Sequence, residues 1–246
     1  TSTLVFFGVA MGTRESIYQQ RYNDSVQGFA DFLRGIYSEV LNVQNLGGGQ
    51  SDLAIYGKLV TFGESTKADG NLAGDDYVIY AYDIVGKADT SKVGTGSLLS
   101  LLLDNDDTGL GANVVVKEGE TYKIAGVIGE YTPKWEAQIQ TPSGDKYTGS
   151  LLIVRHPKSG TVYTFVSNDT VSVNEIIKSG NVTNLSKLLK NGDFSTNERV
   201  DFCVAAAGEG RGNPRRDVRI VANARNASGV ELVDMDGSDN ECMKGV

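Results

Sequence analysis

The apolar residues of the first 45 positions follow the spacing of an amphipathic helix. From Tyr22 onward, large apolar side chains recur at intervals of four and three residues, the period of one helical face. The six side chains of this seam are Tyr22, Val26, Phe29, Leu33, Ile36 and Val40. No proline interrupts residues 1–45, and the first strong stop signal is NLGGG at residues 45–49. The pattern therefore predicts one helix over residues 1–45, about 65 Å long at 1.5 Å per residue.

The start of this helix differs from its later part. Residues 3–12 (TLVFFGVAMG) are apolar on every side of a helix, a pattern typical of burial in a core, in a membrane or among partner helices. Ten residues are too few to span a bilayer, which needs about 20. A head of about 200 residues has a radius of gyration near 16 Å, so roughly half of the helix should project from it. An ordinary N-terminal core helix is the alternative.

The rest of the chain reads as a β-rich head. Segments rich in β-branched and aromatic residues alternate with turn residues. We predict strands at residues 53–62, 77–85, 113–117, 122–128, 135–140, 150–155, 161–166, 200–206, 218–222 and 230–233. Short helices are predicted at residues 96–103, 173–178 and 185–190. The short intervals favour an antiparallel sheet or meander. We therefore predict an α+β fold, with a helix over residues 1–45 packed on a globular head over residues 46–246.

Composition narrows the chemistry of this 246-residue chain. A net charge of −8 argues against a general nucleic-acid-binding surface. A zinc site built from histidine and cysteine would need nearly every such residue of the chain, one histidine and two cysteines, at unsuitable spacing. Nucleophilic catalysis with a histidine base would have to use His156, which ends a predicted strand and precedes a proline, where a surface histidine is expected. We expect no enzymatic activity, and a secreted carboxylate-based hydrolase remains as an alternative.

The two cysteines, Cys203 and Cys242, are the basis of a disulfide prediction. They form an even pair near the C-terminus of a chain that has no other cysteine. Such a pair favours a disulfide that closes a C-terminal loop if the helix ends outside the cytoplasm, where conditions are oxidising. Two unrelated buried thiols are the alternative.

Two segments resemble known proteins. Residues 19–26 (QQRYNDSV), running on to residues 36–40 (IYSEV), look like the amphipathic half of a type IV pilin helix. Residues 217–234 (DVRIVANARNASGVELVD), followed by Cys242, are similar to the C-terminal strands of bacterial pilins and of minor pilins of the FimT or GspH type. The chain therefore resembles a type IV pilin or a pseudopilin at both ends, and residues 50–195 match no family that we can name.

This resemblance implies a filament subunit. The apolar helix ends would lie in the inner membrane before assembly and then pack with those of sister subunits and other pilins in an open helical polymer. The result would be an extracellular pilus on a bacterial cell surface, serving adhesion or twitching motility. The residues expected at subunit contacts are Leu4, Val5, Phe6, Phe7, Val9 and Met11. The seam from Tyr22 to Val40 would pack on the head instead.

The resemblance also implies a segment before residue 1. Pilins carry a basic leader, a processing site and a glutamate five residues into the mature helix, and this sequence has none of them. We therefore expect a missing N-terminal piece. A pseudopilin of a type II secretion machine and a minor or tip pilin that binds DNA or a surface receptor are the alternatives to a major subunit.

Two weaker patterns concern ligands. Five arginines near the C-terminus could contact DNA phosphates, as basic residues of minor pilins do, or could decorate a solvated hairpin. They are Arg211, Arg215, Arg216, Arg219 and Arg225. Asp234, Asp236 and Asp239 alternate oxygen ligands as calcium loops do, without the spacing to a bidentate glutamate. An acidic surface turn is the expected interpretation, so no cofactor is predicted.

Overall fold

The structure, a computed structural model, consists of one long helix and a head of two antiparallel sheets. It describes residues 2–42, 54–63, 77–86, 124–156, 159–168, 194–196, 198–206, 215–233 and 240–243. The predictions for residues 96–103, 113–117, 173–178 and 185–190 lie outside these ranges. The predicted α+β class, with an N-terminal helix and antiparallel sheets, is confirmed.

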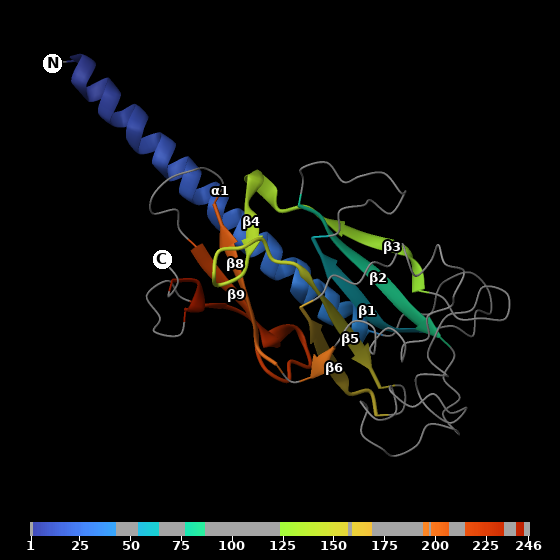
Figure 1. Cartoon of the computed structure of the whole chain (residues 1–246). Helices are drawn as coiled ribbons and strands as arrows, with labels where there is room; N and C mark the ends of the chain where they lie inside the picture. The colour runs from blue at the N-terminus through green and yellow to red at the C-terminus, as the bar shows by residue number, and fades with distance from the viewer. Residues whose placement is uncertain are drawn as a thin grey trace.

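Helix α1 spans Ser2–Leu41 without a break. Its N-terminal part projects beyond the head, and its C-terminal part lies along the strands (Figure 1). The Arg155 guanidinium donates a 2.8 Å hydrogen bond to the Leu41 carbonyl, so a cation satisfies one of the last helical carbonyl groups.

The first sheet has six strands in the order β3-β2-β1-β5-β6-β7. Their bounds are β1 Ala54–Phe62, β2 Ile79–Gly86, β3 Ile124–Tyr131, β5 Gly149–Arg155, β6 Val162–Ser167 and β7 Ser195–Thr196. Every described neighbour pair is antiparallel, with Lys58 of β1 directly opposite Asp83 of β2. The sequence predicted most of these strands within a few residues.

The second sheet has four strands in the order β10-β9-β8-β4. The strands are β4 Gln138–Gln140, β8 Val200–Ala205, β9 Arg215–Ile220 and β10 Val230–Val233. Two short 3₁₀ turns complete this side of the head: Ala227–Gly229 joins β9 to β10, and Glu241–Met243 carries Cys242. The predicted strand at residues 135–140 is wrong in its first part, where a third 3₁₀ turn, Lys134–Glu136, precedes β4.

One hydrophobic core joins α1 to both sheets. The Phe29 ring lies 6.4 Å from the Phe62 ring of β1 and 5.4 Å from the Phe202 ring of β8, both edge to face. Tyr147 packs edge to face on both of these strand rings, at 5.1 and 4.7 Å. Such aromatic contacts stabilise the core beyond simple area burial. The helix therefore fills the angle between the two sheets.

Candidate functional site: the projecting helix and its junction with the head

The six seam positions of α1 are all buried. Val26, Phe29, Leu33 and Val40 are 0% exposed, and Tyr22 and Ile36 are nearly so. All six belong to the core that the helix shares with the two sheets. Their four-three spacing places them on one face, and this face is the one that the head covers.

Polar contacts hold the same part of α1 to strands far away in the sequence. The Tyr22 hydroxyl donates to the Val204 carbonyl at 3.0 Å, and the Tyr37 hydroxyl lies 2.7 Å from Thr164 Oγ1. Arg34 donates to the carbonyl of Val230 at 3.2 Å. Burial raises the pKa of the Tyr22 hydroxyl, which therefore stays protonated as a donor at physiological pH.

The head stops covering α1 between Arg21 and Tyr22. Residues 16–21 are all exposed, whereas Tyr22 is 5% exposed. Residues 2–21 extend over about 30 Å of helix. The six predicted subunit-contact positions, from Leu4 to Met11, lie on this part, where the structure describes the helical backbone.

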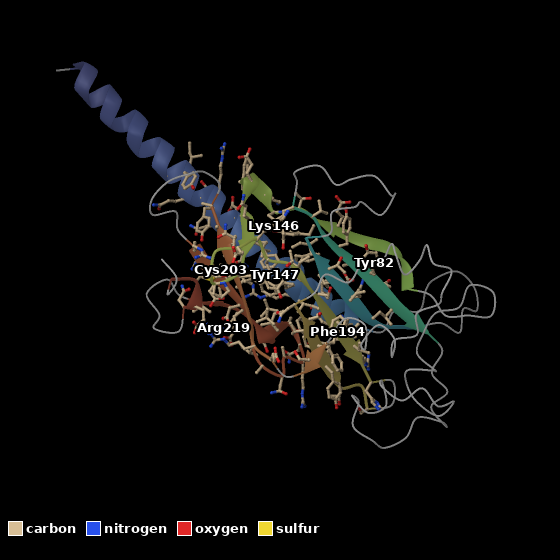
Figure 2. All side chains as sticks on the ribbon, viewed as in Figure 1. Tyr82, Lys146, Tyr147, Phe194, Cys203 and Arg219 are labelled. Carbon is tan, nitrogen blue, oxygen red and sulfur yellow. A yellow bond between two sulfur atoms is a disulfide. The ribbon has the colours of Figure 1, made fainter. Side chains whose placement is uncertain are left out.

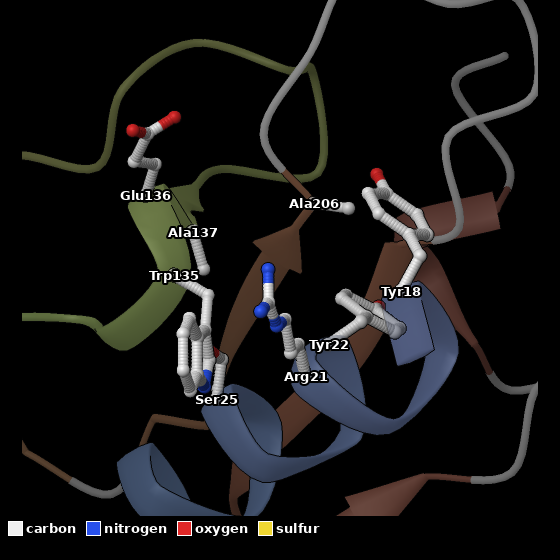
Figure 3. Close-up of a pocket in the computed structure, with 8 residues that line it drawn as sticks. All are labelled: Tyr18, Arg21, Tyr22, Ser25, Trp135, Glu136, Ala137 and Ala206. Carbon is white, nitrogen blue, oxygen red and sulfur yellow. The ribbon is translucent and has the colours of Figure 1, made fainter. Parts of the chain in front are cut away.

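A pocket lies at the junction between α1 and the head (Figure 3). Its volume is about 270 Å³. The residues that line it come from α1, the Lys134–Glu136 turn and the end of β8: Tyr18, Arg21, Tyr22, Ser25, Trp135, Glu136, Ala137 and Ala206. The Arg21 guanidinium carbon lies 4.5 Å from the centre of the Trp135 ring, a cation–π contact.

The Lys134–Glu136 turn has an unusual backbone. Trp135 and Glu136 are both left-handed, with φ of 58° and 57°. Side chains with a Cβ disfavour this conformation by roughly 1–2 kcal/mol per residue. The Ser25 hydroxyl donates to the Lys134 carbonyl and ties the turn to α1. The sequence does not predict this turn, because no spacing links residues 21 and 25 to residue 135. Pro133 was the one local signal of a turn.

A second polar cluster joins the C-terminal half of α1 to the first sheet. Lys58 is nearly buried, and its Nζ lies 2.5 Å from Asp83 Oδ1 and 2.6 Å from Glu39 Oε2. Asp83 is buried beside it on β2, and Glu39 reaches the pair from α1 with about half of its side chain exposed. Burial alone would lower the pKa of Lys58, but the two carboxylates raise it above its ordinary value, so the ammonium stays charged.

The C-terminal arginines do not form one exposed strip. Arg215 is buried and donates to the carbonyls of Thr141 and Pro142, and Arg216 reaches Asn23 of α1. Arg219 is also buried, whereas Arg225 is exposed in the turn after β9. Arg211 lies outside the described residues. Because Arg215 and Arg219 are engaged inside the head, they are poorly placed for duplex phosphates.

Arg219 contacts two carboxylates, one on β8 and one on β9. It contacts Asp201 at 2.6 Å and Asp217 at 2.9 Å, while Arg199 contacts Asp201 at 2.7 Å. Burial and then the neighbouring Asp201 charge raise the pKa of Asp217 to about 7. These four side chains are in contact with one another, and the described pockets lie elsewhere.

The disulfide between Cys203 and Cys242 is confirmed. Cys203 and Arg219, both labelled in Figure 2, belong to the four-stranded sheet. The Asn240 side chain accepts a hydrogen bond from the Cys242 amide, and Arg199 pairs with Glu241 at 3.0 Å. In a loop-entropy treatment, a bond across 39 positions constrains the unfolded chain by about 4 kcal/mol. The bond fastens the C-terminal turn to β8.

Two further features concern the described residues: groups of side chains that could bind a metal ion, and helices that could span a membrane. Among the described residues, no three histidine, cysteine, aspartate or glutamate side chains are grouped so that they could hold a metal ion. The calcium candidates Asp234, Asp236 and Asp239 lie outside these ranges. Over the described residues, no helix combines the length and the apolar character that crossing a membrane requires.

Comparison with known proteins gives no match: no protein-family model, no curated protein and no solved structure resembles this chain significantly. The resemblance to pilins therefore rests on the two sequence segments.

Proposed function

We propose that this protein is a structural subunit of an extracellular type IV pilus-like filament. The observation that carries the proposal is the continuity of α1 from the apolar segment at residues 3–12 into the core of the head. A helix that leaves its own head with an apolar end needs a partner, which is lipid before assembly and sister helices afterwards. At about 25 cal/mol per Å² of apolar surface, packing of such ends drives polymerisation.

The construction of the head supports this role. The helix is held by core packing, by hydrogen bonds and by the Glu39–Lys58 ion pair, so a pull on the projecting part is transmitted to both sheets. The disulfide closes the C-terminal turn onto β8. A subunit on a cell surface benefits from such a head because shear and proteases act on loose ends.

The test compares the full chain with a variant carrying Phe6→Asp and Phe7→Asp. We expect the unchanged chain to sediment as filaments or to float with phospholipid vesicles, and the variant to stay monomeric, because two charges prevent burial of the helix end. A control with Ala222→Asp and Asn223→Asp adds the same charge at an exposed turn of the head and should behave as the unchanged chain. An unchanged chain that neither polymerises nor binds vesicles contradicts the proposal.

Electron microscopy of producing cells distinguishes the subunit classes. Antibody to the head should label a major subunit along the whole length of surface filaments. Label confined to filament tips would replace this proposal with the tip-pilin alternative.

A further inference from the structure

Exposed apolar side chains gather where α1 leaves the head. Four large hydrophobic side chains are exposed among the described residues: Ile17, Tyr18, Leu41 and Trp135. Three of the four, Ile17 (49%), Tyr18 (37%) and Trp135 (51%), lie at the junction, and Tyr18 and Trp135 line the same pocket. Isolated exposed apolar residues are ordinary, but a cluster at one place indicates a contact surface.

The backbone holds Trp135 in this exposed position. Two successive left-handed residues cost roughly 1–3 kcal/mol each, and the hydrogen bond from Ser25 fixes the turn against α1. Core burial does not explain this strained turn, because Trp135 is 51% exposed. The turn places an aromatic ring beside Arg21 at the base of the projecting helix (Figure 3).

The distance of these side chains from the apolar segment of α1 determines how deep they would lie in a bilayer. Tyr18 follows Met11 by seven residues and Arg21 follows it by ten, or about 10 and 15 Å along the helix. The headgroup layer on each side of a bilayer is about 5–8 Å thick. If residues 3–11 lie in hydrocarbon, Tyr18 is within side-chain reach of that layer, and Arg21, which contacts the Trp135 ring, lies about 5 Å further from the hydrocarbon. Tryptophan and tyrosine are enriched at this depth, because one end of each ring is apolar and the other polar.

Arg21 supplies the charge that a headgroup requires. Within the described ranges it contacts the Trp135 ring and forms no ion pair with a carboxylate, so its guanidinium donors are open to the pocket. A guanidinium binds the oxygens of a phosphate through parallel hydrogen bonds. The pocket of about 270 Å³ is small for a folded protein partner, which would bury about 800 Å² on each side. A lipid headgroup has the matching size.

We propose that Tyr18, Arg21 and Trp135 form a site for the phosphate headgroup of a membrane lipid. The site holds the head at the membrane surface while the apolar end of α1 lies in the bilayer. This inference rests on the proposed function, in which the subunit resides in a membrane before assembly.

The chain has a single tryptophan, so Trp135 reports on the site directly. The experiment mixes the full chain with vesicles of phosphatidylcholine and phosphatidylglycerol whose acyl chains carry bromine at either a shallow or a deep position. We expect the Trp135 emission to shift to shorter wavelength, with stronger quenching by the shallow bromines than by the deep ones. Flotation of the same samples measures vesicle binding independently.

Two variants with matched controls identify the residues. Arg21→Gln should lower affinity for these vesicles roughly fivefold, because one cation near an anionic surface contributes about that factor. Arg225→Gln makes the same charge change on an exposed turn of the head and should have no effect. Ile17→Ser with Tyr18→Ser should abolish the emission shift, whereas Leu41→Ser, at the other end of α1, should not.

The outcomes separate this inference from the proposed function. If the chain floats but Trp135 emission is unchanged, the headgroup site is wrong, although the membrane-bound subunit stands. If the chain neither floats nor polymerises, the proposed function fails as well. If Trp135 is shielded only in lipid-free filaments, the cluster is a contact between subunits, and the lipid site is overturned.

Discussion

Residues 22–41 and residues 2–21 of α1 belong to one continuous helix, yet the head covers one face of the later part and leaves residues 16–21 exposed. In the later part, a one-sided seam faces two sheets and polar side chains bond to distant strands. In the earlier part, residues 16–21 are exposed and the helix projects away from the head (Figure 1). Helix propensity alone does not decide such a difference, because packing of an apolar face supplies most helical stability in proteins. The spacing of the apolar residues along α1 therefore indicates which part of the helix packs against its own head.

The largest expected effect comes from the centre of the packed part. Phe29→Ala should lower the free energy of unfolding by about 3–5 kcal/mol, because the ring is fully buried between Phe62 and Phe202. Ile17→Ala, in the uncovered part, should change it by less than about 0.5 kcal/mol. Urea denaturation of both variants measures the two values. Equal losses would show that the head also covers the earlier part of the helix.

A second test removes the ionic tie between α1 and the first sheet. Lys58→Met should cost about 3 kcal/mol or more, because Asp83 is then buried without its cation. Adding Asp83→Leu should recover most of this loss, since both buried charges are gone. As a surface control, Asp31→Ala breaks the more exposed pair with Arg34 and should cost under about 1 kcal/mol. A double variant no better than Lys58→Met would mean that the cluster is held by something other than charge pairing.

The same contrast explains what the sequence could predict. The seam of α1, most strands and the cysteine pair were predictable, because each leaves a local signal in spacing or residue type. The two-sheet arrangement was not, because the crossing from β4 in one sheet to β5 in the other is a tertiary event. The predicted strand at residue 218 starts earlier, at Arg215, because the Arg215 side chain donates to the carbonyls of Thr141 and Pro142, which are remote in sequence.

The junction site was the least predictable part. Trp135 fits a strand by residue type, and tertiary contacts with Ser25 and Arg21 impose a turn instead. The C-terminal arginines show the same limit of prediction from sequence, here for residues that were expected to share one surface. Five basic residues close in sequence indicated a shared surface, but Arg215 and Arg219 are directed into the head. Charge patterns in a sequence do not show which side of a strand will be covered.

A third effect concerns pH and the buried carboxylate of Asp217 on β9. The pKa of Asp217 rises from 3.8 in the unfolded reference to about 7 in the folded protein, so the folded state binds the extra proton between these values. This contribution to stability is full below pH 4 and is lost as the pH rises through 7. Asp217→Asn, which cannot ionise, should therefore gain stability relative to the unchanged chain as the pH rises from 4 to 8. Urea unfolding at several pH values measures the difference, and a constant offset between the two proteins would contradict it.

The smallest expected effect concerns the boundary between the exposed and the buried part of α1. Tyr22 is the first buried residue after the exposed residues 16–21 of α1, and its hydroxyl donates to the buried Val204 carbonyl at 3.0 Å. Tyr22→Phe keeps the ring but removes this donor, so we expect a loss of about 1 kcal/mol. Tyr18→Phe, one turn earlier on the exposed side of the boundary, should cost clearly less. Thermal unfolding of the two variants compares the two sides of the boundary four residues apart. A larger loss for Tyr18→Phe would move the boundary toward the N-terminus and shorten the uncovered part of the helix.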